Sequence, residues 1–422
     1  MNINELLKGV GCECGRHHSC DIDYVYIEKG AILRLGELCK NYKSVLIVAD
    51  ENTFNAAGKQ VLSALSGKNT NQVVFGGKTV LIPNEKTVAA VEEALNDADL
   101  IIGIGSGVIQ DTCKYVSFEK KIPYFIVATA PSMDGYASTG AAMIMGGMKV
   151  TYSTGLPSAI IADTEVLKNA PMEMIKAGYG DIIGKFSALG DWELSREVNG
   201  EYFCPYVYNL TYEMIEKTLS LADGLLKRDE KAVAVLMDAL VTVGIAMSFA
   251  GTSRPASGSE HHLSHFFEIT GIVNGENYFP HGIDVAYSTV VTAGICEKIK
   301  NSQFLSVPYI MSRNEYEAEM QRVYKTVSEG CIALQDKMGR YGENRIPVYQ
   351  EKEAKIRKIL EKMPSPAEII KMLESAGLDI NEFYKFYGEA KIKDAIKYAK
   401  DLKDRYTVLW MNYDLFKGEH HE

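Results

Sequence analysis

The chain has 422 residues, which suits two domains or one large one, and its hydrophobic content of 46% is sufficient for a sizeable core. Its formal net charge of −10, without a basic tract that carries interleaved aromatic residues, argues against a dedicated nucleic-acid-binding protein. No apolar run reaches the roughly 18 residues of a membrane span. Residues 1–8 lack the charged start and apolar centre of a signal peptide, so we expect a cytoplasmic protein.

Cysteines in that compartment are expected to be reduced thiols. Three of the eight cysteines gather in G-C-E-C-G-R-H-H-S-C, residues 11–20. The residues there that could hold zinc are Cys12, Cys14, His18 and Cys20. Because their spacing differs from that of zinc knuckles and ribbons, we interpret the segment as a surface turn in preference to a metal site.

The first part of the chain alternates short apolar runs with helical patterns, which predicts a mainly parallel sheet with helical crossovers. The expected strands cover 22–29, 43–50, 71–75, 100–103, 123–130 and 158–167. Helices are expected between the first four of these strands, over 31–40, 53–65 and 87–95.

Asp50 ends the apolar run 43–50, at the carboxyl edge where open parallel sheets bind ligands. A carboxylate there can accept hydrogen bonds from a ribose. It can equally cap the helix that follows, and the sequence leaves both roles open.

A glycine turn is the strongest local signal in the first half. The strand 100–103 runs into Gly105-Ser106-Gly107 and then into a helix that carries Asp111 and Lys114. Backbone amides of such a turn, with the helix N-terminus, can bind a pyrophosphate. The turn is not the G-x-G-x-x-G fingerprint, and it follows Asp50 instead of preceding it by about twenty residues. A plain connection between two elements therefore remains the alternative.

A second polar loop, P-S-M-D-G-Y-A-S-T-G-A, follows the strand 123–130. Thr129 and Ser132 offer hydroxyls to a phosphate or a nicotinamide, and Asp134 offers a carboxylate to a hydroxylated substrate. An ordinary strand-to-helix turn uses the same small polar residues, so both interpretations stay open.

From about residue 168 helical patterns dominate. The expected helices cover 173–197, 211–224, 229–250, 259–268, 284–299, 314–338, 351–362, 366–376, 381–388 and 391–402. We therefore expect an α/β domain over 1–168 and an all-helical domain over 169–422.

Four of the eight histidines lie in R-P-A-S-G-S-E-H-H-L-S-H and the following P-H-G-I-D. His261 and His265 are four residues apart and should project from one helical face, and His281 could approach the same point. His265 could bind a metal or a substrate, and the spacing in the sequence does not distinguish these two roles. His262 must point elsewhere, and we assign it to the surface or to the surroundings of the site.

Asp181 is the candidate carboxylate for this site. It lies in an apolar, glycine-rich part of the helix expected over 173–197, an unusual place for a solvated acid. Gly184, Lys185 and Ala188 should share its face and leave room beside it. On its own, Asp181 would be interpreted as a helix cap. Together with two histidines, however, it matches the ligand set of a metal ion that polarises a substrate oxygen.

Five motifs, in this order, resemble the bacterial sn-glycerol-1-phosphate dehydrogenases, a family related to iron-containing alcohol dehydrogenases, glycerol dehydrogenase and 3-dehydroquinate synthase. The motifs are G-I-G-S-G-V-I-Q-D-T-C-K, A-T-A-P-S-M-D-G-Y-A-S, G-Y-G-D-I-I-G-K-F-S-A-L-G-D-W, S-R-P-A-S-G-S-E-H-H-L-S-H and P-H-G-I-D-V-A. The resemblance implies an N-terminal Rossmann-like domain and a C-terminal helical metal-binding domain, as in the dehydroquinate synthase-like fold. The implied reaction is the reversible reduction of dihydroxyacetone phosphate to sn-glycerol 1-phosphate with NAD(P)H. Phospholipid metabolism and a homodimer are expected with it.

The resemblance also implies roles for individual residues. Asp181, His261 and His281 would hold the metal, zinc or nickel. Asp134 and His265 would contact the substrate beside Asp181. The implied cofactor contacts are Asp50, Gly105, Ser106, Gly107, Val108, Ile109, Thr129, Ala130, Pro131, Ser132 and Ser138.

The expected catalytic residues are Asp181, His265 and Lys185. We further hypothesise that Lys185 or Arg254 binds the substrate phosphate, because a charge-assisted pair suits that dianion. Asp50 would repel a 2′-phosphate, which favours NAD over NADP.

Three alternatives remain. A glycerol or other polyol dehydrogenase would use the same scaffold. A 3-dehydroquinate synthase-like lyase would need more basic residues around its acidic substrate than these motifs offer. A non-catalytic metal- or nucleotide-binding protein would keep the fold, but the three filled ligand positions argue against it.

Overall fold

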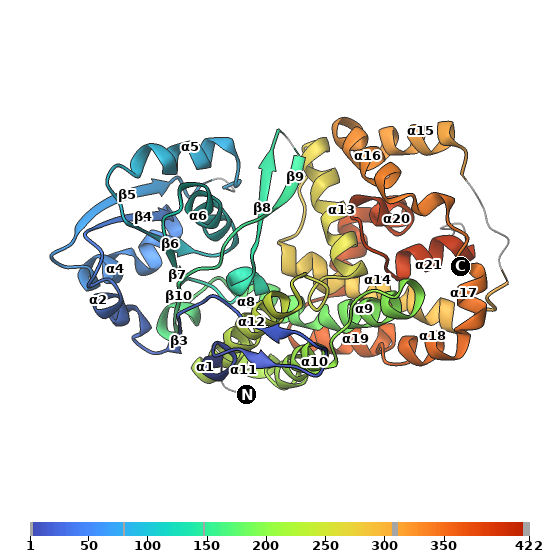
Figure 1. Cartoon of the computed structure of the whole chain (residues 1–422), viewed down its shortest axis with the longest axis horizontal. Helices are drawn as coiled ribbons and strands as arrows, with labels where there is room; N and C mark the ends of the chain where they lie inside the picture. The colour runs from blue at the N-terminus through green and yellow to red at the C-terminus, as the bar shows by residue number, and fades with distance from the viewer. Residues whose placement is uncertain (1–2, 79–80, 147, 306–310, 417–422) are drawn as a thin grey trace. The chain divides into compact units, whose positions relative to one another are not determined.

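The computed structural model describes residues 3–78, 81–146, 148–305 and 311–416, in two compact units (Figure 1). The first unit comprises Met1–Ile182 and Glu216–Ser253, and the second comprises Ile183–Ile215 and Arg254–Glu422. This division differs from the expected one at residue 168, because the chain returns to the first unit after leaving it.

A six-stranded parallel sheet in the order β3-β10-β7-β6-β4-β5 forms the first unit. Its strands are β3 (Tyr24–Glu28), β4 (Ser44–Asp50), β5 (Asn69–Phe75), β6 (Leu100–Gly105), β7 (Tyr124–Ala128) and β10 (Ala159–Asp163). The expected parallel sheet is confirmed. The strand expected over 158–167 ends early, because Asp163 accepts a hydrogen bond from the backbone N–H of Glu165 and caps a helix.

Helices cover both faces of this sheet. The helices lying wholly or largely in the first unit are α1 (Ile3–Leu6), α2 (Leu35–Leu38), α3 (Glu51–Thr53), α4 (Lys59–Ala64), α5 (Glu85–Ala94), α6 (Gly107–Lys120), α7 (Thr164–Leu167), α8 (Met172–Ile183), α11 (Ala222–Leu226) and α12 (Glu230–Ala250). Helices α2 and α4 pack on one face, and α5 and α6 on the other (Figure 1). Along β4, Val45 and Ile47 enter the first of these cores and Leu46 and Val48 the second. Burial on both sides explains why this strand is a continuous apolar run.

The direction of the chain across the sheet reverses between β4 and β6. From β4 the chain goes outward to β5, returns past β4 to β6, and continues to β7 and β10. The carboxyl ends of β4 and β6 therefore form the switch point at which open α/β sheets bind ligands. Because Ala49 pairs with Ile104, Asp50 and Gly105 stand next to each other at this edge.

Two antiparallel hairpins accompany the sheet, and neither was expected from the sequence. One joins β1 (Val10–Gly11) to β2 (His17–His18), and the other joins β8 (Gly140–Met145) to β9 (Met148–Ser153). The first contains the turn expected over 11–20 and adds a short strand on either side of it.

Helix α12 has the length and composition of a membrane span, although Asp238 interrupts its apolar run. Among the described residues it is the one helix long and apolar enough to cross a membrane, with a mean hydropathy of 2.1 over an 18-residue window. That window is 78% buried within the protein, and burial accounts for its composition.

The second unit, over its described residues, consists of helices and no strands, which confirms the expected helical domain. Its helices are α9 (Lys185–Asn199), α13 (Ser259–Asn274), α14 (His281–Lys300), α15 (Arg313–Tyr324), α16 (Ser328–Met338), α17 (Ile346–Glu351), α18 (Glu353–Leu360), α19 (Pro366–Ser375), α20 (Ile380–Tyr398) and α21 (Val408–Phe416), while α10 (Pro205–Leu219) belongs partly to each unit.

Helix breaks correct two of the expected boundaries. The helix expected over 173–197 is two helices, α8 and α9, with Gly184 between them. Gly184 itself keeps helical dihedral angles, with φ −54° and ψ −25°. The helix expected over 314–338 is broken at Lys325, where φ is +45°.

Candidate active site

The glycine turn lies at the switch point of the sheet. Ser106 precedes the first turn of α6, and its side chain does not cap the helix. The amides of Gly107, Val108 and Ile109 thus begin a helix that has no side-chain cap, where backbone N–H groups and the helix dipole favour an anion. Gly105 is required for packing, since an added Cβ would lie 2.7 Å from Cβ of Ile109.

Asp50 is a helix cap. Its Oδ1 accepts hydrogen bonds from the backbone N–H groups of Asn52 and Thr53, at 2.8 and 2.9 Å. The Thr53 hydroxyl accepts in turn from the Asp50 backbone N–H. The capping alternative is therefore confirmed. Because both hydrogen bonds from the backbone amides are accepted by Oδ1, a ribose hydroxyl would donate to Oδ2.

The loop after β7 runs beside the glycine turn. The Thr129 backbone N–H donates to the Gly105 carbonyl at 3.1 Å. Thr129, Ser132 and Asp134 are all buried. The predicted cofactor residues from β4, β6 and β7 are thus brought to one edge of the sheet.

Lys114 has a structural role in holding this loop. Its buried ammonium donates to the carbonyls of Gly135 and Gly140, at 3.2 and 2.8 Å. The Ser138 hydroxyl donates to the Gly135 carbonyl as well. Burial raises the pKa of the neighbouring Asp111 to about 6. Ser138 is therefore part of the loop's internal bonding.

Asp134 and Asp181 are connected within the first unit. Oδ2 of Asp181 accepts a hydrogen bond from the Asp134 backbone N–H at 2.9 Å, and Asp181 is fully buried. Gly178, one turn earlier in α8, touches the same loop, since an added Cβ would lie 1.8 Å from the Pro131 carbonyl oxygen. Close packing on the loop explains the glycine-rich sequence around Asp181.

Three histidine rings converge in the second unit, as the sequence predicted. His261 and His265 lie one turn apart on α13, and His281 is the first residue of α14. The ring centroids are 5.0 Å apart for His261 and His281, 5.6 Å for His265 and His281, and 6.0 Å for His261 and His265.

A buried carboxylate orients the first of these rings. Nδ1 of His261 lies 2.6 Å from Oε1 of Glu260. Glu260 also accepts hydrogen bonds from the Gly258 backbone N–H and the Ser187 hydroxyl, at 2.8 and 2.7 Å. Burial raises the pKa of Glu260 to about 6. An ionised Glu260 keeps the proton of His261 on Nδ1 and leaves the Nε2 lone pair for a metal.

Asp191 fixes the start of α13. Its carboxylate accepts hydrogen bonds from the backbone N–H groups of Ser259 and Val408, both at 2.6 Å. Burial, with the nearby charge of Glu260, raises the pKa of Asp191 to about 7. Gly258 allows this approach, because an added Cβ would lie 2.6 Å from Oδ2 of Asp191.

Sequence reasoning missed both of these acids. Glu260 was detectable from its place directly before His261, since metal-binding histidines commonly donate to a carboxylate. Asp191 has no comparable neighbour in the sequence. Its partner Val408 is far away in the chain, so no local signal was available.

The helical unit also offers a second set of metal ligands. His265, Glu268 and His281 present ligand atoms within 4.8 Å of one another. His281 thus belongs to this set as well as to the predicted one. The distances among the histidines and Glu268 do not distinguish between the two sets of ligands.

His262 is not at the surface, which rules out the first of its two expected places and leaves the surroundings of the site. Its side chain is buried, and neither ring nitrogen has a hydrogen-bond partner among the described residues. Burial, and then the positive charge of Arg405, lowers its pKa well below 6.5. His262 is therefore a neutral core residue.

The two candidates for phosphate binding differ in their surroundings. Arg254 is buried and donates to the Glu201 carboxylate at 2.7 and 2.5 Å, to the Ser195 hydroxyl and to the Tyr406 carbonyl. This bonding gives Arg254 a structural role. Lys185 is also buried and donates to the Ala256 carbonyl at 3.0 Å.

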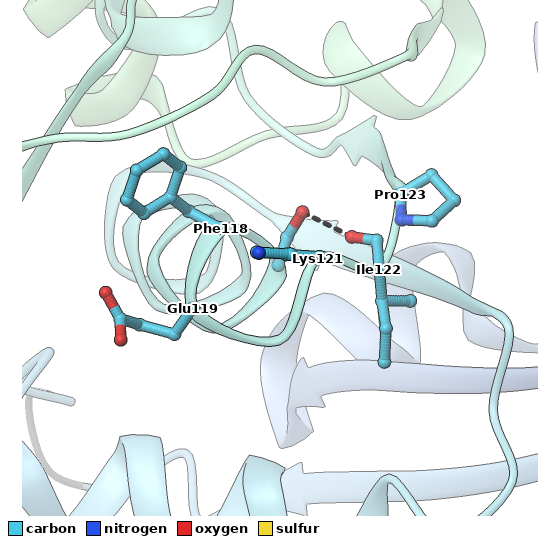
Figure 2. A pocket seen from close by; sticks show the side chains of 6 residues that line it. Phe118, Glu119, Lys121, Ile122 and Pro123 are labelled. Atoms are coloured by element: carbon cyan, nitrogen blue, oxygen red, sulfur yellow. Dashed lines mark hydrogen bonds between the residues drawn. The ribbon is translucent and has the colours of Figure 1, made fainter.

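A surface hollow lies at the other end of α6, and Figure 2 shows side chains that line it, among them Phe118, Lys121 and Pro123. The Ser117 hydroxyl donates to the Ile122 carbonyl there, at 2.6 Å. The 14 residues of α6 place this hollow about 20 Å from the glycine turn, at the amino edge of the sheet. None of the predicted site residues lines it.

Comparison with known proteins relates the whole chain to dehydrogenases. The family described as iron-containing alcohol dehydrogenase matches residues 26–171. A glycerol-1-phosphate dehydrogenase from Geobacillus thermodenitrificans that uses NAD(P) is 31% identical over 97% of this chain and 96% of its own length. An enzyme of the same description from Methanosarcina mazei is 37% identical over 57% of this chain and 68% of its own.

Solved structures agree on the fold. A probable glycerol dehydrogenase from Sinorhizobium meliloti matches with a TM-score of 0.60 and 16% identity, over 94% of this chain and 96% of the other. At this identity the match supports the architecture alone.

Proposed function

Because the chain belongs to the family of NAD(P)-dependent glycerol-1-phosphate dehydrogenases, we propose that it reversibly reduces dihydroxyacetone phosphate to sn-glycerol 1-phosphate with NADH or NADPH. The observation that carries this proposal is the convergence of His261, His265 and His281 beside the buried Glu260. Such a cluster suits a metal-dependent reduction of a carbonyl group.

Asp181, His261 and His281 would hold the divalent metal. We prefer this set to His265, Glu268 and His281 because Glu260 already fixes the tautomer of His261 that a ligand needs. When bound, the metal supplies a positive charge that polarises the ketone oxygen of the substrate.

The carboxyl edge of the sheet would hold the cofactor. The turn from Gly105 to Ile109 would bind the pyrophosphate, because its amides begin an uncapped helix. The loop from Thr129 to Ser132, with Ser138, would contact the nicotinamide half. Asp50 would accept from the ribose, and its charge disfavours the 2′-phosphate of NADP.

The remaining residues would bind the substrate and move a proton. Reduction adds a hydride to the carbonyl carbon and a proton to its oxygen. His265 would supply that proton or relay it, and Asp134 would accept a hydrogen bond from the substrate hydroxyl. Lys185 is the better candidate for the phosphate, because Arg254 is engaged by Glu201, Ser195 and Tyr406.

Further attributes belong to the same proposal. Zinc or nickel would be the metal, since imidazole nitrogens suit both. We place the enzyme in the cytoplasm, as a homodimer, where its product would serve phospholipid metabolism.

Substrate comparison tests the proposal. Oxidation of NADH is followed with dihydroxyacetone phosphate and with unphosphorylated dihydroxyacetone, and the product is identified by chiral analysis. We expect a strong preference for the phosphorylated ketone and formation of sn-glycerol 1-phosphate. Equal rates on both ketones would indicate a polyol dehydrogenase. Absence of net NADH oxidation with either would leave a lyase or a binding protein.

A further inference from the structure

The N-terminal hairpin brings together two cysteines and a histidine, none of which is used in the proposed reaction. Strand β1 pairs with β2 so that Val10 faces His18. The ligand atoms of Cys12, Cys14 and His18 lie within 4.8 Å of one another, and Sγ of Cys14 is 3.5 Å from Nε2 of His18. Side chains scattered on a surface turn would not gather in this way.

The turn between the strands has a defined geometry. The Cys12 backbone N–H donates to the Arg16 carbonyl at 3.1 Å, and the Gly15 N–H donates to the Cys12 carbonyl at 3.0 Å. Gly15 has a φ of +84°, a conformation that disfavours other residues. This tight turn brings Cys12 and Cys14 back toward β2.

His18 is fixed in the form that a metal ligand requires. Its side chain is 1% exposed, and its Nδ1 lies 2.9 Å from the Phe249 carbonyl oxygen. A carbonyl can only accept, so Nδ1 carries the proton and the lone pair is on Nε2, the atom near Cys14. The ring also stacks on that of Phe249, with centroids 5.3 Å apart.

The hairpin is attached to the C-terminal end of α12. Besides the bond from His18 to the Phe249 carbonyl, the Arg16 guanidinium donates to the Ala250 carbonyl at 3.2 Å. The last carbonyls of a helix have no partners within the helix, so the hairpin satisfies two of them. A metal bound in the hairpin would therefore hold the N-terminal segment on the helix end.

We propose that Cys12, Cys14 and His18 form a structural zinc site, separate from the metal of the proposed reaction. Two thiolates and an imidazole nitrogen are ligands that zinc prefers, and the two thiolates neutralise its charge. A water or a further side chain would complete the tetrahedron. Cys20, which the sequence had included, lies outside this group and is buried in the core.

Cobalt substitution of the full-length protein tests the site independently of turnover. Cobalt bound to thiolates gives a charge-transfer band in the near ultraviolet, which the carboxylate and imidazoles of the other site do not produce. We expect this band in the parent protein, together with a second equivalent of bound metal. The band should disappear in the double variant C12S/C14S, and metal affinity should fall at least about tenfold in His18→Gln.

Matched controls come from the same segment. His17 is exposed and Cys20 is outside the cluster, so His17→Gln and Cys20→Ser should keep both the band and the second equivalent. The Cys12 and Cys14 variants should retain metal-dependent turnover, since neither residue belongs to the proposed active site. No thiolate band in the cobalt-loaded parent, or an unchanged metal content in C12S/C14S, would overturn the proposal.

A second measurement uses the parent protein, so it remains informative if the cysteine variants fail to fold. Alkylation of Cys12 and Cys14 is followed by mass spectrometry, with zinc alone and after chelation. Bound zinc should protect both thiols, and the chelator should expose them. Equal rates of alkylation under both conditions would count against the site, whatever the outcome of the activity assays.

Discussion

Glu260 lies 2.6 Å from Nδ1 of His261, which we propose as a ligand of the catalytic metal. We predict that Glu260→Gln lowers the affinity for the catalytic metal by about 10- to 100-fold, because a neutral amide accepts more weakly from Nδ1 and can also donate to it, which would favour the wrong tautomer of His261. Metal content is measured at equilibrium against a competing chelator.

Glu268→Gln is the matched control. If Asp181, His261 and His281 hold the metal, this second variant should bind it nearly as tightly as the parent. The reverse order, with Glu268→Gln the weaker binder, would favour the set of His265, Glu268 and His281.

Lys185 is predicted to bind the substrate phosphate. Lys185→Met keeps most of the side-chain volume and removes the charge. Loss of one charge-assisted hydrogen bond costs about 1.5–3 kcal/mol, so KM for dihydroxyacetone phosphate should rise at least about tenfold. KM for unphosphorylated dihydroxyacetone should hardly change. A similar rise for both ketones would assign Lys185 to the fold alone, through its bond to Ala256.

Asp50 combines a cap with a predicted cofactor contact, and Asp50→Ser separates the two roles. Serine can still accept from the amides of Asn52 and Thr53, so stability should be kept. Removing the charge should raise kcat/KM with NADPH relative to NADH about tenfold or more. Asp163→Ser, at the cap of α7, should leave this ratio unchanged.

At the scale of elements, the glycine turn between β6 and α6 is the part most sensitive to shape. In Gly105→Ala the new Cβ would overlap Ile109, and the turn must shift. We predict a KM for NADH raised at least about tenfold and a loss of about 1–3 kcal/mol in the free energy of unfolding. Gly155→Ala, where an added Cβ meets nothing within 4 Å, should behave as the parent. Parent-like NADH binding in Gly105→Ala would argue that the pyrophosphate binds elsewhere.

Strands and helices differed in how well the sequence predicted them. The strands β4, β6 and β7 were predicted because burial on both faces gives unbroken apolar runs. The hairpin of β1 and β2 was missed, since strands of two residues carry no periodicity. The break at Gly184 was missed because the residues on either side of it continue a helical pattern.

For the molecule as a whole, the division into a parallel-sheet unit and a helical unit was predictable, but its boundary was not. Helix α12 follows residue 168 in the chain, where only the helical unit was expected, yet it belongs to the first unit. The part of the candidate site that was predicted is the part that individual side chains reveal in the sequence. The three histidines could be predicted from their residue type and spacing. Glu260 and Asp191 accept hydrogen bonds from backbone amides and a hydroxyl, several of which the fold brings to them from distant parts of the chain.

The proposed function requires that turnover of dihydroxyacetone phosphate depend on a metal bound by these histidines. Oxidation of NADH is followed after complete chelation and again after zinc or nickel is restored, in the parent and in His261→Ala and His281→Ala. The parent should lose its activity on chelation and regain it with at least one of the two metals, and neither variant should regain it. An apoenzyme that remains fully active, or a parent that stays inactive with every divalent metal supplied, would contradict the proposed function.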